Sequence, residues 1–145
     1  MEIDLIVHGT PGPQGSKTRT RYGMKESSEK VGPWREAVVS EVLRSGYQYM
    51  LLDEPLEADI VFHLRRIQSH YRTGSKAGEL KPDAPEFVMK PPDVDKLVRS
   101  TLDGLTQSGV IKDDSRFVRI TAEKRYSDSA FVGAVITIRT IEEQR

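Results

Sequence analysis

The alternation of apolar and polar residues predicts four strands and two helices. Apolar residues recur at every second position over residues 3–8, 55–64, 117–124 and 130–138, which is the period of a half-buried strand. Over residues 34–47 and 93–108 they recur every three or four positions, which is the period of an amphipathic helix. The order β, α, β, α, β, β predicts an α+β fold, a small mixed β-sheet with two main helices packed on it.

The second predicted helix carries both a buried stripe and a charged face. We expect Asp93 to be its N-cap residue and Gly109 to end it, because glycine adopts the left-handed conformation at low cost. The expected buried stripe consists of Val94, Leu97, Val98, Thr101, Leu102 and Leu105. Asp95, Arg99 and Asp103 are spaced by four, so they share one face beside that stripe. An exposed ladder of ion pairs is the simplest interpretation of this face.

Two segments show neither period. Residues 9–32 are rich in Gly, Pro and Ser and are also basic, so we expect a loop. Residues 65–92 are polar and aperiodic, and a stretch of this length inside a compact domain is usually functional or disordered. Both segments contain several Lys and Arg residues that could follow the phosphates of DNA. The alternative is a pair of solvated, mobile loops.

Composition limits the classes of protein to consider. The 145 residues suit one domain, which we place at 1–145. The 22 basic and 22 acidic residues give a net charge of zero, so any DNA-binding surface must be a local patch. The chain has no cysteine, which excludes disulfides and thiolate metal sites. Neither a signal peptide nor an apolar run of membrane-spanning length is visible, so we expect a cytoplasmic location and no membrane partner.

The most informative chemical feature is a set of aspartates between Asp93 and Asp114. They form three clusters: Asp93 with Asp95, then Asp103, then Asp113 with Asp114. Carboxylates repel one another, and a hard divalent cation such as Mg²⁺ is the usual reason for a fold to bring several together. Beside Lys and Arg, such a set suggests metal-dependent chemistry on a phosphodiester. The alternative is a helix cap, a solvated side chain and a turn, and spacing alone does not decide between the two.

The same aspartates occur in an ordered motif. It reads Pro92-Asp93-Val94-Asp95-Lys96-Leu97-Val98-Arg99, then Leu102-Asp103-Gly104-Leu105, then Gly109, then Asp113-Asp114-Ser115-Arg116-Phe117-Val118, and finally Lys124. This motif resembles that of the RusA family, the phage and prophage Holliday junction resolvases. Residues 9–17 and 70–76 are similar to family members more loosely. Lys96 stands where the family usually has Asn, and Arg99 stands where it usually has Lys.

The resemblance implies a RusA-like endonuclease domain and a specific chemistry. It implies a Mg²⁺-dependent endodeoxyribonuclease, with Mn²⁺ as a substitute, that resolves four-way junctions by paired symmetric nicks. Family members are similarly homodimeric, so a homodimer acting on branched DNA is expected, in a bacterial or phage-infected cytoplasm. A two-fold dimer would also match the symmetry of the junction.

The resemblance also implies roles for individual residues. Asp93, Asp95 and Asp114 would be metal ligands, and Asp113 a fourth ligand or an orienting residue. Arg99 would grip the scissile phosphate, but a proton-transfer role is in doubt because arginine does not lose its proton. A hairpin-like return of the chain would bring Asp113 and Asp114 beside Asp93 and Asp95. The implied DNA-binding residues are Lys17, Arg19, Arg21, Arg72, Lys76, Lys96 and Lys124, although Lys124 could equally be a solvent-facing strand residue.

Three rival functions stay open at this point. A nuclease of the same fold could act on other branched or flap DNA. A non-catalytic protein could bind branched DNA without cutting it, although such a protein would be expected to lack a ligand carboxylate, and none is missing here. A small α+β interaction protein with a merely acidic surface would show no DNA affinity at all.

Overall fold

The computed structural model describes residues 1–15, 17–20, 23–26 and 29–144, and for 17–20 and 23–26 it describes the backbone alone. The strands are β1 (Glu2–His8), β2 (Lys17–Thr20), β3 (Gly23–Glu26), β4 (Leu56–Leu64), β5 (Phe117–Tyr126) and β6 (Gly133–Thr140). The helices are α1 (Val31–Ser45) and α2 (Val94–Ser108). Short 3₁₀ turns lie at Gln68–His70, Gly74–Lys76 and Asp114–Arg116.

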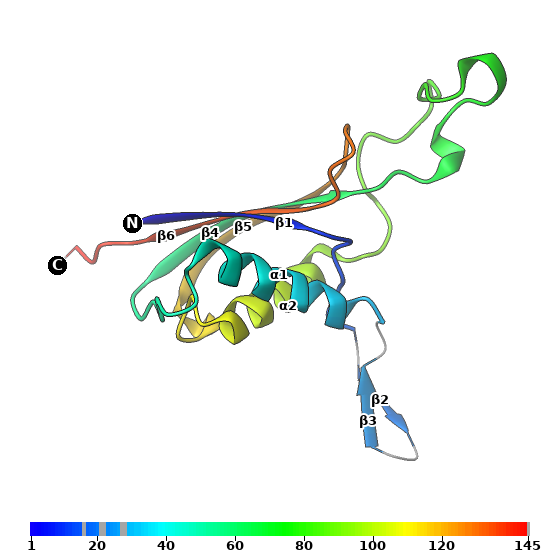
Figure 1. Ribbon diagram of the computed structural model, residues 1–145. Helices are drawn as coiled ribbons and strands as arrows, with labels where there is room; N and C mark the ends of the chain where they lie inside the picture. Colours follow the sequence, from blue (N-terminus) through cyan, green and yellow to red (C-terminus); the bar gives the residue numbers. More distant parts are fainter. Residues whose placement is uncertain (16, 21–22, 27–28, 145) are drawn as a thin grey trace.

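A four-stranded sheet forms one layer and the two helices form the other. The strand order is β1-β6-β4-β5, with β4 and β5 parallel and the other neighbours antiparallel. Both helices cover the same face of the sheet and leave the opposite face open (Figure 1). The predicted α+β fold with a mixed sheet and two main helices is therefore confirmed. In the part of the chain that is described, no helix is long and apolar enough to cross a membrane.

The hydrophobic core lies between these two layers. Alternate residues of β4 are buried, as the alternation predicted: Leu64 packs in a separate cluster, and those from Leu56 to Phe62 lie in this core. Trp34 of α1 is buried among them, and its Nε1 donates a hydrogen bond of 3.0 Å to the Oγ1 of Thr101 on α2. This buried bond satisfies the indole N–H and fixes the register between the helices.

The buried stripe of α2 differs from the predicted one. Leu97, Thr101 and Leu105 are buried as expected, and so are Ser100, Gly104 and Ser108, whereas Val94, Val98 and Leu102 are only half-buried. The reason is the close packing of α1. A Cβ placed on Gly104 would lie 3.0 Å from the Cβ of Val38, so the helices approach through small residues. Val98 and Leu102 lie beside these small residues and pack against the edge of the core.

The first predicted loop is wrong in two respects. Residues 9–32 contain the antiparallel hairpin β2–β3 and the first residues of α1, which begins at Val31. The hairpin strands have the sequences KTRT and GMKE, which show no apolar alternation, so the pattern could not reveal them. At the other end of the chain, β5 extends to Tyr126 and β6 begins at Gly133, later than the predicted start at 130.

Residues 65–92, which we call the arm, form an extension that projects beyond the sheet (Figure 1). It folds back on itself, because the backbone N–H of Arg72 donates to the oxygen of Glu79 at 2.8 Å and that of Lys81 donates to His70 at 2.9 Å. The predicted structureless loop is therefore a paired extension with a tip near Gly74. Its regularity comes from backbone pairing and not from an apolar pattern.

Candidate active site

Asp93 and Asp95 lie at the N-terminal end of α2. Asp93 occupies the N-cap position, as predicted, but its side chain makes no capping hydrogen bond and instead lies 3.5 Å from the Nζ of Lys96. Asp95 is exposed in the first turn, and within the described part of the chain it forms no ion pair. The helix macrodipole and the free N–H groups of this turn favour negative charge here. The carboxylates of Asp93 and Asp95, two residues apart in the sequence, are therefore both exposed to solvent at this end of the helix.

Arg99 lies one turn further along α2 and is exposed. The predicted ladder of ion pairs does not form, because Asp103 pairs with Arg35 of α1 at 3.3 Å. Arg35 also donates a hydrogen bond to Gln14. Among the residues that the structure describes, none forms an ion pair with Arg99. Its guanidinium is thus available to an external anion such as a phosphate.

Lys124 of β5 braces the turn that leads into α2. Its Nζ donates to the carbonyl oxygens of Lys90 and Pro92, each at 2.9 Å, and the side chain is half-buried. Neither interpretation of Lys124 made from the sequence included this role. The two bonds tie the residues immediately before Asp93 to the edge of the sheet. They fix the place at which the helix begins.

A second brace comes from the loop after β1. The N–H of Gln14 donates to the carbonyl of Lys96 at 2.9 Å, and the Oγ of Ser100 donates to the carbonyl of Gly12 at 2.6 Å. A Cβ on Gly12 would lie only 2.2 Å from the carbonyl oxygen of Lys30. Residues 9–15, which resemble the family's start only loosely, therefore hold the first half of α2 in place. The sequence indicated either a loop that follows DNA phosphates or a solvated loop for this segment, and neither prediction included its bracing role.

Gly12→Ala should therefore destabilise the protein. The added methyl group would overlap a backbone oxygen that cannot rotate away, so we expect a loss of about 2 kcal/mol or more in the free energy of unfolding. Urea unfolding measures this loss. Gly32→Ala is the matched control, because a Cβ there meets nothing within 4 Å and should leave stability unchanged or raise it. Equal stability of the two variants would contradict the close contact.

Asp113 and Asp114 lie at the other end of α2. They follow Ile111, which bridges to Leu52, and they precede β5, which starts beside Leu56. A helix of 15 residues is about 22 Å long, and α2 runs its whole length between Asp93 and this turn. Within one chain, the predicted hairpin-like return beside Asp93 and Asp95 is therefore wrong. Over the described residues, no group of three or more Asp, Glu, His or Cys side chains could hold a metal ion.

The two aspartates of this turn differ in their surroundings. The Oδ2 of Asp113 accepts a hydrogen bond of 3.0 Å from the N–H of Ser115. Hydrogen bonds from Ser115, the side chain first and then the backbone, lower the pKa of Asp113 below its ordinary value. The nearby Lys112 and Arg116 are both paired with Asp53, at 3.2 and 2.6 Å. Asp113 thus caps the turn, while Asp114 is exposed at the start of the 3₁₀ turn.

Comparison with known families identifies the family of this chain. The family model for endodeoxyribonuclease RusA matches residues 9–139. The chain belongs to the RusA family. This membership indicates endodeoxyribonuclease activity on DNA junctions and therefore the binding of branched DNA. A search among curated proteins found no match to the chain.

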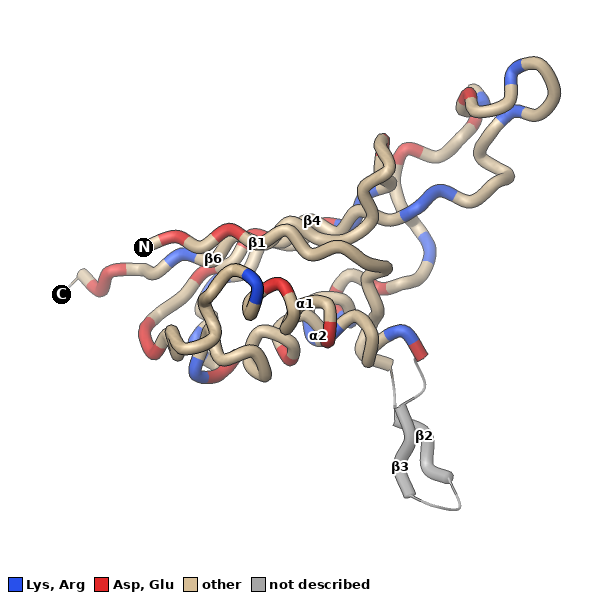
Figure 2. The backbone as a smooth tube through the Cα atoms, viewed as in Figure 1, with Lys and Arg blue, Asp and Glu red and all other residues tan. Residues whose placement is uncertain are grey.

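The predicted DNA-binding residues of this RusA-family chain lie in different surroundings. Arg21 and the side chains of Lys17 and Arg19 lie outside the described residues. Arg72 is half-buried and Lys76 is exposed near the tip of the arm, along which basic residues recur (Figure 2). Their place near the tip of the arm leaves them separate from Asp93 and Asp95.

The arm is anchored at its base by an aromatic contact. The guanidinium of Arg66 lies 4.5 Å from the ring centroid of Tyr126 on β5 and donates to the carbonyl of Pro85 at 2.7 Å. The ring of His70 meets the same tyrosine edge-on at 5.2 Å. Burial, with Arg66 nearby, lowers the pKa of His70, so this ring is neutral at pH 7. The base of the arm is thus packed against the end of the sheet.

Proposed function

We propose that this RusA-family endonuclease resolves four-way DNA junctions by paired symmetric nicks that require Mg²⁺. The observation that carries the proposal is the pair of exposed carboxylates, Asp93 and Asp95, one helical turn from the exposed Arg99. Mg²⁺ is commonly held by one or two protein carboxylates together with substrate phosphates. Two neighbouring aspartates at a helix N-terminus fit that need.

Each residue has a separate task in this proposal. Asp93 and Asp95 hold the metal ion, which when bound lowers the pKa of a water and neutralises the leaving oxygen. Arg99 holds the scissile phosphate and stabilises the charge that develops on it. Because arginine stays protonated, Arg99 acts as a fixed charge and does not transfer a proton. Lys124 and the loop at 9–15 keep the start of α2 in position.

We infer further that a second copy of the chain completes the site. Asp114 lies about one helix length from Asp93 in its own chain, so it can reach a metal at Asp93 and Asp95 only from another protomer. A closed two-fold dimer would then carry two identical composite sites. Such an arrangement fits a four-way junction, which is itself symmetric and is resolved only when two strands of like polarity are cut.

One assay tests the proposed function against its rivals. The protein is incubated with labelled four-way junction, linear duplex and flap DNA, each with Mg²⁺ and with EDTA. We expect paired symmetric cuts in the junction alone, and only with Mg²⁺. Preferential cutting of the flap would favour the rival nuclease, and junction binding without cutting would favour the non-catalytic binder. The absence of any DNA binding would contradict all three.

The arm should contribute to DNA affinity through phosphates. In the variant Arg72→Ala with Lys76→Ala, junction binding should weaken and its dependence on salt should flatten. Each lost phosphate contact removes about 0.9 from the slope of log affinity against log salt concentration, so two contacts remove about 1.8. Fluorescence anisotropy at several salt concentrations gives the slope. Arg44→Ala, which removes an exposed charge paired with Glu41 on α1, serves as the control. An unchanged slope in the arm variant would mean that the arm does not touch DNA.

A further inference from the structure

A cavity lies beside the start of α2, between the base of the arm and the loop that follows β1. Its volume is about 590 Å³, and its walls include Pro13 from the loop, Val88 from the arm and Pro92 immediately before Asp93. Cavities of this volume are typical of small-molecule sites. The cavity therefore adjoins the candidate active site and has room for a ligand.

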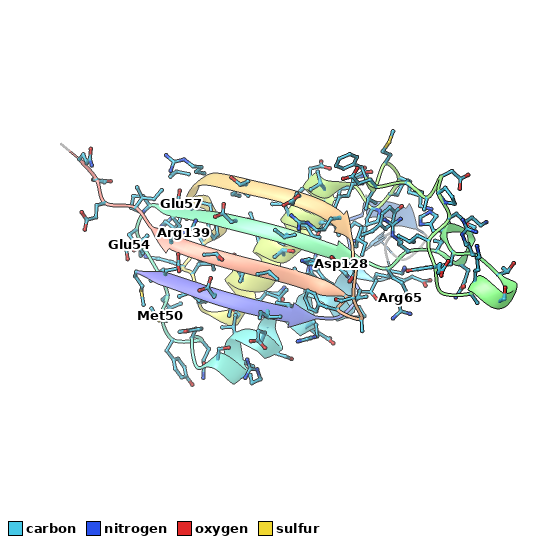
Figure 3. The ribbon with its side chains drawn as sticks, turned by 90° about the horizontal axis from the view of Figure 1, so that it is seen from above. Met50, Glu54, Glu57, Arg65, Asp128 and Arg139 are labelled. Atoms are coloured by element: carbon cyan, nitrogen blue, oxygen red, sulfur yellow. The ribbon has the colours of Figure 1, made fainter. Side chains whose placement is uncertain are left out.

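The walls of the cavity combine an apolar interior with a positively charged rim. Leu64, Val88 and Tyr126 are buried and supply the apolar part. Lys30, Arg65 and Lys90 supply three exposed cations, and among the residues that the structure describes no Asp or Glu lines the cavity. Arg65 lies at the end of the sheet from which the arm departs (Figure 3). Such a cavity suits a ligand with a planar apolar part and a phosphate.

The charges of the three cations are not paired with any carboxylate that the structure describes. Within the ranges that the structure describes, Lys30, Arg65 and Lys90 form no ion pair with a carboxylate. Other exposed cations of the chain do pair, as Lys112 and Arg116 do with Asp53. Three unpaired positive charges around one cavity raise its affinity for an anion.

The cavity is also held in shape before any ligand binds. Tyr126 is fixed on one side by Arg66 and on its edge by His70, as described above. Val88 is packed with Leu64 and Tyr126 in a small apolar cluster of its own. A site with walls held in this way loses little free energy to ordering when it binds.

We propose that this cavity receives one unpaired nucleotide of the branched DNA, with its base against the apolar walls and its phosphate at Lys30, Arg65 and Lys90. The proposal rests on the proposed junction cleavage. A nucleotide at a branch point has lost part of its stacking, so extruding it costs little, and the apolar walls replace part of the lost contacts. Because Pro92 joins the cavity to Asp93, capturing one nucleotide selects the phosphate that reaches the carboxylates.

The test places 2-aminopurine at each branch-point position of a four-way junction in EDTA, so that binding is measured without cleavage. We expect the fluorescence to rise at least about twofold at one position, because the base leaves the stack, and to stay constant in a linear duplex with the same label. Ile67 also lines the cavity and is exposed, so Ile67→Trp would fill the cavity from its rim. It should abolish the rise and weaken junction binding by at least about fivefold, with duplex affinity unchanged.

Two further variants make the result specific. Leu80→Trp is the matched control, because Leu80 is 46% exposed on the arm, close to the 45% of Ile67, and does not line the cavity. It should behave as the unmodified protein. Arg65→Gln with Lys90→Gln changes only exposed side chains, so it should fold normally and still lose the fluorescence rise. Added thymidine monophosphate at about 1 mM should not compete, because a free nucleotide lacks the neighbouring phosphates that the rest of the protein holds.

Several outcomes would overturn the proposal. Tight junction binding with no fluorescence change, and with equal affinity in Ile67→Trp, would refute the cavity while leaving the nuclease intact. Full competition by thymidine monophosphate would assign the cavity to free nucleotides. A changed dimer mass in Ile67→Trp would mean that the cavity holds part of a second copy. Failure of the unmodified protein to bind any junction would instead contradict the proposed function.

Discussion

Asp95→Asn should abolish cleavage of a four-way junction while junction binding persists. The substitution keeps the shape of the side chain but removes one negative charge from the proposed metal site at the start of α2. We expect the rate of cutting to fall by at least about 100-fold, as when a fixed electrostatic group is removed from an active site. Binding should hold or tighten, because one charge that repels phosphate is gone. Gel cleavage with Mg²⁺ and anisotropy with EDTA measure the two quantities.

Related variants define how specific this effect is. Asp93→Asn should match Asp95→Asn, whereas Asp113→Asn should be milder, because Asp113 is engaged with Ser115 in its own turn. Asp128→Asn also removes an exposed carboxylate, from the turn between β5 and β6, and should cut normally (Figure 3). Cutting at the unmodified rate by Asp95→Asn would refute the assignment of the metal site.

Mixing the variants Asp95→Asn and Asp114→Asn should restore cutting that neither variant shows alone. If each site takes Asp93 and Asp95 from one protomer and Asp114 from the other, a mixed dimer has one site with both changes and one site with neither. Random pairing makes half of the dimers mixed, so nicking should recover to about a quarter of the unmodified level. The recovered activity should nick junctions without resolving them, because each mixed dimer has one working site.

The matched control mixes Asp95→Asn with Asp93→Asn. Both changes fall in the same half of the composite site, so every dimer has two damaged sites and no activity should return. Sedimentation should give about twice the 16.4 kDa mass of the chain at micromolar concentration. A lack of recovery in the first mixture, with mixed dimers present, would show that Asp114 does not act across the interface. A monomer that makes paired cuts would refute the dimer and leave the nuclease assignment intact.

The elements with a strong apolar period could be predicted from the sequence. The alternation from Leu56 to Leu64 gave β4, and the spacing of Leu97, Thr101 and Leu105 with Gly109 as the stop gave α2. Elements that depend on backbone pairing could not be predicted, since the sequences of β2, β3 and the arm show no apolar period. Ser100 and Gly104 were missed because their burial depends on how closely α1 approaches, which is a tertiary fact.

For the candidate site, the sequence predicted which residues matter but not how they are placed. The residue types and the family motif were enough to single out Asp93, Asp95 and Arg99, which the structure leaves exposed near one another on α2. Their separation from Asp114 was missed, although the length of α2 and the short connection after it leave Asp114 at the far end of the helix. The bracing role of Lys124 was missed because its partners are backbone carbonyls, which carry no signature in the sequence.

Insertions and deletions should be tolerated at the tip of the arm but not within α2. Between Thr73 and Ala77 the arm is exposed and its pairing is internal, so insertions or deletions there should be accommodated by the tip alone. In α2, one added residue would turn everything beyond it by about 100°. Such an insertion would move Leu105 out of the core and carry Asp114 to a new side of the molecule. The number of residues between Asp93 and Asp114 is therefore fixed by the packing of α2, the helix that separates them.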